Sequence, residues 1–146
     1  MKLKPKGLKV RHRMSRDFAT VAPDDPLQKV VELLRRRDIR SVPVVDNGTL
    51  IGIVTDRDVR SVVPAYPFFR DEKEIRHYSE HLKVTAAMTA DPLRVDADAP
   101  LMEAAKLLET YKIGALPVVS GNRLVGMISV TDMLKVFIEQ NEVQKQ

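Results

Sequence analysis

The sequence contains no cysteine, and this absence excludes several kinds of chemistry at once. Disulfide bonds, thiolate nucleophiles and cysteine-based zinc sites all need this side chain. Glycine is scarce as well: the six glycines are scattered singly, so no glycine-rich loop is available to cradle a phosphate. A G-x-S-x-G nucleophile motif is also missing. These absences argue against an enzyme.

Long apolar runs are absent too. No stretch approaches the roughly 20 apolar residues that a membrane-spanning helix needs. The segment 1–7 is positively charged but no apolar core follows it, so it does not resemble a secretory signal. With 44% apolar and 30% charged residues, the 146-residue chain has the composition of a soluble globular protein. We therefore expect a cytoplasmic protein with no membrane partner.

The positive charge lies mainly in the first part of the chain. Residues 1–60 hold 14 Lys/Arg and 8 Asp/Glu, a net charge of +6, whereas residues 61–146 hold 10 and 12, a net charge of −2. The segment 2–13 is the strongest candidate for contact with nucleic acid. It lacks the interleaved aromatic residues of a single-strand stacking surface, which favours a solvated tail.

An internal repeat dominates the sequence. Shifted by 74 positions, residues 10–62 match residues 84–136 at 17 of 53 positions without a gap. Such self-similarity indicates one supersecondary unit that occurs twice and can share a core.

Each copy predicts the same order of elements. In the first copy, Asp24–Pro26 resembles a helix start, and apolar residues at i, i+3, i+4 and i+7 from Leu27 predict an amphipathic helix. A β-rich run over 39–45, a turn over 46–48 and a returning strand over 50–54 predict a hairpin. A second helix follows Thr55. With a short leading strand, each copy is therefore predicted to be β-α-β-β-α, an α/β fold.

The repeated motifs resemble the CBS repeat. The pattern Met-[Ser/Thr], Pro-Leu, Ile-x-x-h-Pro-Val-Val and Gly-h-h-[Thr/Ser]-x-x-Asp, in which h is apolar, occurs twice at one spacing. Its parts are Met14-Ser15, Pro26-Leu27, 39–45 and 52–58, then Met88-Thr89, Pro100-Leu101, 113–119 and 126–132. The chain is similar to the tandem CBS pair, or Bateman module, and to stand-alone acetoin-utilisation-type CBS proteins.

The resemblance implies two repeats packed with pseudo-twofold symmetry, a cleft on each side, and dimerisation into a flat disc. We expect a basic N-terminal segment at 1–9, CBS repeat 1 at 10–63 and a helical linker at 64–83. CBS repeat 2 then covers 84–139 and a C-terminal tail 140–146. Because the pattern covers nearly the whole chain, any output would pass to an effector protein encoded elsewhere.

The resemblance also implies adenosine-containing ligands and assigns their contacts. Asp58 and Asp132 would hold the ribose hydroxyls, and Thr55 and Ser129 would contact ribose or phosphate. A carboxylate can accept two hydrogen bonds from a vicinal diol, and a hydroxyl at a helix start lies where phosphate is favoured. The adenine slot would be lined by Val42, Pro43, Ala115, Leu116 and Pro117. AMP, ADP, ATP and S-adenosylmethionine all remain candidates, and no cofactor or metal is expected.

Simpler interpretations stay open for these residues. Thr55-x-x-Asp58 and Ser129-x-x-Asp132 also fit a capping box, which needs no ligand. Arg40 and Arg57 would lie near a ligand phosphate in repeat 1, whereas repeat 2 has Gly114 and Thr131 there; solvated surface charge explains the arginines equally well.

The histidines at 77 and 81, four residues apart, are explained by a solvated helix face better than by a metal site.

The expected function is a regulatory adenine-nucleotide sensor that acts by changing shape. One alternative is a dimerisation or scaffold module with empty clefts. Another is a nucleic-acid-associated protein that uses the basic N-terminal segment.

Overall fold

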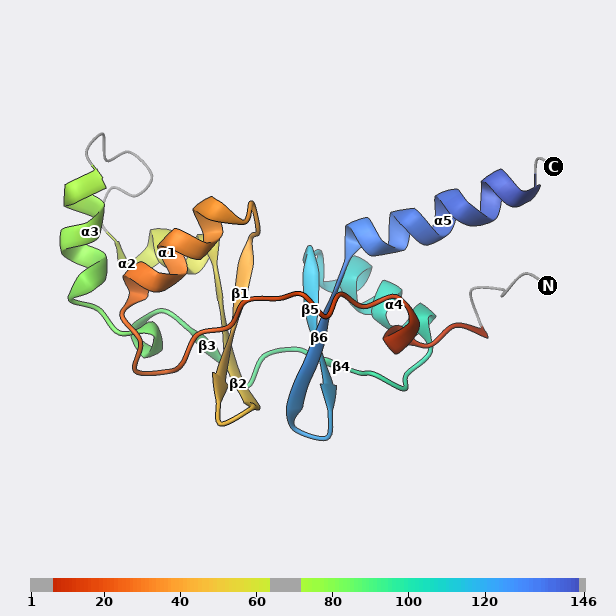
Figure 1. Ribbon diagram of the computed structural model, residues 1–146, viewed down its shortest axis with the longest axis horizontal. Coiled ribbons are helices and arrows are strands. Elements are labelled where there is room, and N and C mark those ends of the chain that lie inside the picture. Colours follow the sequence, from red (N-terminus) through yellow and green to blue (C-terminus); the bar gives the residue numbers. More distant parts are fainter. Residues whose placement is uncertain (1–6, 64–71, 145–146) are drawn as a thin grey trace. The chain divides into compact units, whose positions relative to one another are not determined.

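The computed structural model describes residues 7–63 and 72–144, which form two compact units (Figure 1). The first unit is Ala19–Pro92, and the second unit combines Met1–Phe18 with Leu93–Gln146. Each unit is a small sheet with helices packed on it. The expected α/β class is confirmed.

The first unit is built on a hairpin with helices on either side of it in sequence. Its elements are α1 (Leu27–Arg36), β1 (Ser41–Asp46), β2 (Thr49–Thr55), α2 (Asp56–Val62), α3 (Glu72–Glu80), a 3-10 turn Val84–Ala86 and β3 (Thr89–Ala90). The antiparallel strands β1 and β2 pair along their length, and β3 pairs with β2. Within the expected linker 64–83 the structure has the helix α3, while 64–71 lie outside the described residues.

The second unit repeats this plan with different helix lengths. Its elements are a 3-10 turn Val10–His12, β4 (Val95–Asp96), α4 (Leu101–Tyr111), β5 (Ala115–Ser120), β6 (Arg123–Ser129) and α5 (Val130–Gln144). β5 and β6 are antiparallel, and β4 pairs in parallel with β5. The last helix has 15 residues where α2 has seven, and in Figure 1 it extends well past the end of β6.

The two hairpins share an irregularity and differ in their turns. Each has a register shift at the same place in the repeat, between Val44 and Val45 and between Val118 and Val119. Asn47 and Gly48 both have positive φ, as a type I′ turn requires. In the second turn, Gly121 alone has positive φ. The predicted hairpins are thus present in both copies.

The leading segment of each repeat lies in the unit of the other repeat. Ser15, from the start of repeat 1, pairs with Met127 on β6, and Thr89, from the start of repeat 2, pairs with Ile53 on β2. Val10 and Val84 follow the same exchange, since they are fully buried in the second and first cores respectively. The sequence repeat and the compact unit are therefore not the same stretch of chain.

The helix starts at α1 and α4 depart from the expected cap. The N-cap residues are Pro26 and Pro100 themselves, and neither has a side-chain cap. The carboxylate of Asp25 instead accepts a hydrogen bond from the Ala22 amide at 2.8 Å, which lowers the pKa of Asp25. Proline has no side-chain acceptor for the first helical amides. The first amide of each helix instead donates to a backbone carbonyl distant in sequence, Leu27 N to Leu82 O at 2.7 Å and Leu101 N to Leu8 O at 2.8 Å.

Candidate functional site

Thr55 and Asp58 close a reciprocal hydrogen-bond pair at the start of α2. The Asp58 amide donates to Thr55 Oγ1 at 3.1 Å, and the Thr55 amide donates to Asp58 Oδ2 at 2.8 Å. Thr55 has extended backbone (φ −104°, ψ 165°), so the strand ends and the helix begins at this residue. The capping interpretation of this motif is therefore realised in the structure.

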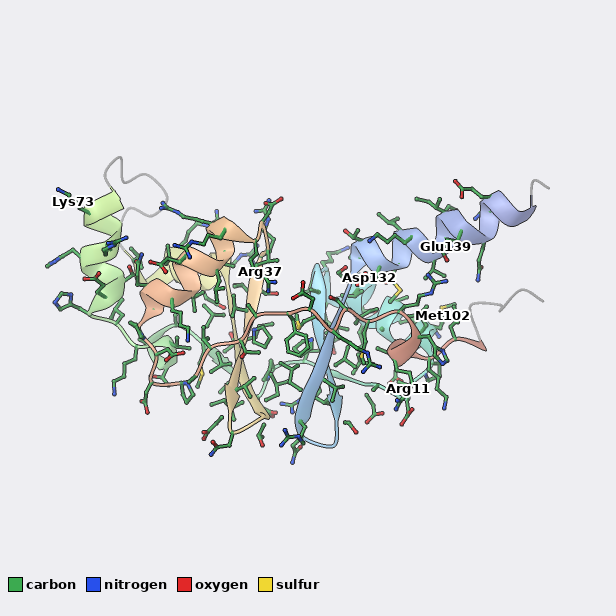
Figure 2. The ribbon with its side chains drawn as sticks, in the orientation of Figure 1. Arg11, Arg37, Lys73, Met102, Asp132 and Glu139 are labelled. Atoms are coloured by element: carbon green, nitrogen blue, oxygen red, sulfur yellow. The ribbon has the colours of Figure 1, made fainter. Side chains whose placement is uncertain are left out.

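Ser129 and Asp132 form the same box at the start of α5. The Asp132 amide donates to Ser129 Oγ at 3.2 Å, and the Ser129 amide donates to Asp132 Oδ2 at 2.8 Å. A third hydrogen bond is found only here: the Ser129 hydroxyl lies 2.9 Å from Asp132 Oδ2 and donates to it. Figure 2 shows Asp132 where α5 leaves the end of β6.

The caps occupy one oxygen of each carboxylate. In both boxes the acceptor is Oδ2, and no hydrogen bond between described residues involves Oδ1 of Asp58 or Asp132. Both side chains are half-buried rather than enclosed. Each aspartate can thus hold its helix start and still offer a second, charged acceptor to a ligand hydroxyl.

Two arginines flank the box of the first unit. The Arg40 carbonyl accepts a hydrogen bond from the Asp56 amide at 3.0 Å, which holds Arg40 beside the start of α2, and Arg57 lies in the first turn of that helix. Both residues are exposed, and neither forms an ion pair with a described residue. In the second unit the same backbone bond joins Val130 N to Gly114 O at 2.9 Å, without the cations.

The residues expected to line an adenine slot occupy the central strands, but two of them belong to the cores. Val42 and Leu116 are fully buried, each within the apolar core of its own unit. Pro43 and Pro117 are also buried, and Ala115 is half-buried. The side chains of Val42 and Leu116 are therefore already packed within the cores.

The methionine and the glycine of the repeated pattern pack against each other in both units. The motifs alone did not explain why either residue recurs. A Cβ placed on Gly52 would lie 2.8 Å from Met88 Sδ, and a Cβ placed on Gly126 would lie 2.6 Å from Met14 Sδ. The close approach explains why these strand positions hold glycine. It also explains why a Met recurs at the start of each repeat. The 74-residue shift shows that both residues recur, but it gives no signal that they are in contact.

Two arginines of the segment 2–13, the candidate for nucleic-acid contact, pair with carboxylates of their own unit. Arg11 Nε donates to Asp98 Oδ1 at 2.7 Å, and Arg13 lies 2.5 Å from Glu139 Oε2 on α5. The hydrogen bond from the Arg13 guanidinium lowers the pKa of Glu139 and raises the pKa of Arg13. These ion pairs reduce the positive charge that the segment offers to a polyanion.

The two histidines of the linker lie close together on the surface at the end of α3. Their ring centroids are 4.9 Å apart, and His81 Nδ1 lies 2.6 Å from the His77 carbonyl. Among the described residues there is no group of three or more His, Asp or Glu side chains that could hold a metal ion. None of the helices within 7–63 and 72–144 combines the length and apolar character needed to cross a bilayer.

Comparison with known proteins gives a family match over most of the chain. The model of the CBS domain matches residues 10–65 and 84–139. A CBS domain-containing protein of Dictyostelium discoideum is 36% identical over 133 residues, which is 89% of this chain and 91% of the relative.

Solved structures give the same result. The acetoin utilization protein AcuB of Vibrio cholerae superimposes with a TM-score of 0.77 at 32% identity, over 94% of this chain and 96% of that one. CBSX2 of Arabidopsis thaliana, solved in complex with AMP, superimposes with a TM-score of 0.75 at 26% identity, over 91% and 98% of the two chains.

Proposed function

Since the chain belongs to the family of CBS-domain proteins, we propose that it is a non-catalytic regulatory module that binds an adenosine-containing nucleotide. Each unit offers one helix-start site, made by Thr55 and Asp58 in the first and by Ser129 and Asp132 in the second. The observation that carries the proposal is the acceptor Oδ1 of each aspartate, which the cap leaves available for a ribose hydroxyl. The likeness to CBSX2, which binds AMP, supports the ligand class.

The first unit is the better match for a phosphorylated ligand. Arg40 and Arg57 stand beside its box, and guanidinium groups form the strongest hydrogen bonds that proteins make to phosphate. The second unit has Gly114 and Thr131 instead, so its site suits a less charged adenosyl compound or stays empty. We therefore expect AMP, ADP or ATP at the first site, and S-adenosylmethionine is a candidate at the second.

The proposed mechanism is a shift between conformations. A ligand that binds one conformation more tightly changes the populations by its differential affinity, and a partner protein reads that change. The module is proposed to act as a cytoplasmic homodimer that passes its state to a separate effector protein. A scaffold module with empty sites is the alternative of another class.

Binding can be tested on ligand-stripped protein with AMP, ADP, ATP, S-adenosylmethionine and NAD, first by thermal shift and then by calorimetry. A ligand at 100 times its Kd adds about 2.7 kcal/mol of stability, which raises Tm by several degrees. The informative variants are Asp58→Asn and Asp132→Asn. Each keeps an amide oxygen for the cap and removes the charged acceptor, so loss of binding without loss of stability identifies a ligand contact.

A matched control is Asp46→Asn, which removes the same charge from an exposed residue at the end of β1. Its nucleotide affinity should equal that of the unaltered protein. If no compound shifts the Tm of the unaltered protein, the two aspartates are helix caps alone, and the scaffold function replaces the sensor.

A further inference from the structure

Two histidines at the end of α3 form a pair that the proposed nucleotide sites do not use. His77 lies in the last turn of the helix, and His81 directly follows it. Both residues are exposed, and their ring centroids are 4.9 Å apart with the ring planes tilted by 51°. The spacing of four residues brings both rings to the same side of this turn. We call these two residues the α3 histidine pair.

The hydrogen bond of His81 leaves one of its ring nitrogens available to a metal ion. Its Nδ1 lies 2.6 Å from the His77 carbonyl oxygen, and no hydrogen bond between described residues involves its Nε2. A carbonyl only accepts hydrogen bonds, so Nδ1 donates, and in the neutral ring Nε2 then carries the lone pair. Metal-binding histidines usually donate their other N–H to a carbonyl or a carboxylate, which fixes the tautomer and the ring. His81 therefore already has the supporting hydrogen bond of a metal ligand.

The distance between the two rings fits one shared ion. If each ligating nitrogen lies about 2.1 Å from the metal and about 1.2 Å from its ring centroid, the centroids are roughly 4.7 Å apart at an octahedral angle and roughly 5.4 Å apart at a tetrahedral one. The measured 4.9 Å lies between these values. The spacing in sequence did not favour a metal site, whereas this ring geometry does.

The local electrostatics also favour a cation at this end of α3. The C-terminal end of a helix carries the partial negative charge of its unpaired carbonyl groups. Two cationic side chains lie close to the pair in sequence, and each has a carboxylate partner. Arg76 is 3.9 Å from Glu80, and Lys83 is 3.4 Å from Asp24. Their positive charge is therefore offset before a metal ion approaches.

We propose that the α3 histidine pair binds one divalent transition-metal ion, of the class of Zn²⁺, Ni²⁺ and Cu²⁺. Imidazole nitrogen is a preferred ligand of these ions, whereas Mg²⁺ and Ca²⁺ prefer oxygen. Among the described residues no third His, Asp or Glu side chain joins the pair to form a larger metal-binding group, so water completes the coordination. The site is thus open and exchangeable, unlike a structural zinc site with four protein ligands.

An ion at this site stabilises the attachment of the linker to the first unit. α3 packs on α1, and the fully buried Ser79 donates a hydrogen bond to Gln28 of α1. Just beyond the pair, the Leu82 carbonyl accepts the amide of Leu27, the first residue of α1, at 2.7 Å. An ion that fixes the pair therefore steadies the segment between α3 and the start of α1. This metal input is separate from the proposed nucleotide sites and does not depend on them.

Calorimetric titration of Zn²⁺ into the metal-stripped full chain tests the proposal. We expect one ion to bind with a Kd in the micromolar range, and Mg²⁺ not to bind. His77→Ala and His81→Ala should each raise the Kd for Zn²⁺ at least about tenfold, because two ligands are reduced to one. The matched control is His12→Ala, which removes the third histidine of the chain, an exposed residue of the second unit, and should leave the Kd unchanged. Circular dichroism checks that each variant is folded.

A second variant tests the spacing of the pair rather than the number of histidines. His81→Ala/Lys83→His keeps three histidines in the chain but places the new one six residues after His77, so its Kd for Zn²⁺ should stay as weak as that of His81→Ala. Zn²⁺ should also raise the Tm of the unaltered protein and not that of His77→Ala. Equal Zn²⁺ affinity in the unaltered protein and both single variants, or an equal loss in His12→Ala, would overturn the proposal.

Discussion

The two units of this protein share their framework but differ on their exposed helix faces. Both have a hairpin with a register shift at the same step, a capping box at the second helix and a Met–Gly contact on the second hairpin strand. In both, a non-glycine residue adopts the left-handed conformation after the first helix, at Asp38 and at Lys112. These shared features determine the backbone conformation of both units.

The differences lie where side chains meet solvent. Around the end of α1 and along α2, the first unit presents arginines, whereas the matching positions of the second unit are acidic, neutral or apolar. The matched pairs are Arg35 and Glu109, Arg36 and Thr110, Arg37 and Tyr111, Arg40 and Gly114, Arg57 and Thr131, and Arg60 and Leu134. Within one duplicated framework, one copy is equipped for anions and the other for apolar contact. The proposed phosphate selectivity of the first unit follows from this division.

The largest expected effect on stability comes from adding a methyl group to the strand glycines, Gly52 and Gly126. Gly126→Ala would bring Cβ to 2.6 Å from Met14 Sδ and 3.0 Å from the Ser15 carbonyl, and Gly52→Ala meets the corresponding atoms at 2.8 and 3.1 Å. Overpacking of this kind costs about 1–3 kcal/mol, and more is expected at Gly126. Urea unfolding measures both, with Gly114→Ala as the control, because nothing lies within 4 Å of its Cβ. Equal stability of all three would remove the Met–Gly contact from the account.

Removal of the carboxylate from each capping box should give a smaller loss of stability, and the loss should differ between the two units. Asp58→Ala removes the acceptor of one hydrogen bond, whereas Asp132→Ala removes the acceptor of two, since the Ser129 hydroxyl also donates to it. Loss of a cap costs about 0.5–2 kcal/mol, so both variants are destabilised and Asp132→Ala more so. The difference is measured by urea midpoints. Asp58→Ala as the more damaging of the two would contradict the geometry.

Glycine substitutions at the ends of α1 and α4 should give the smallest change in stability, and this change should be stabilising. Lys112 has φ 53° and ψ 47° at the end of α4, and Asp38 has φ 51° after α1. Glycine adopts this conformation without steric cost, so Lys112→Gly should stabilise the protein by roughly 0.5–1 kcal/mol. Asp38→Gly should gain less, because aspartate tolerates the conformation better than lysine. Thermal unfolding decides the order, and a lower Tm for Lys112→Gly would contradict it.

Much of the fold could be predicted because both copies of the repeat carry the same local sequence signals. The apolar spacing from Leu27 and the Asn47–Gly48 turn each specify a local structure, and both elements are found. Because the sequence repeats after 74 residues, the same prediction can be made independently in each copy. The box at Thr55 and Asp58 was also predictable, since a hydroxyl followed three residues later by a carboxylate caps a helix by local geometry.

What could not be predicted depends on contacts between distant segments. The pairing of Ser15 with Met127 and of Arg13 with Glu139 joins residues more than 100 positions apart, and neither has a local sequence signature. The exposure of apolar residues on α5 was not predicted, because apolar residues occupy both sides of that helix. The sequence alone does not tell the buried Val136 from the exposed Phe137.

The measurement that tests the central claim most directly is calorimetric titration of AMP and of adenosine into the protein and into an Arg40→Gly/Arg57→Thr variant. This variant gives the first unit the residues of the second at both positions. If the arginines bind the phosphate, the Kd for AMP rises at least about tenfold, since one charge-assisted hydrogen bond contributes about 1.5–3 kcal/mol. The Kd for adenosine stays the same. An unchanged Kd for AMP, or an equal loss for both ligands, would contradict the claim that the first unit selects its ligand by phosphate.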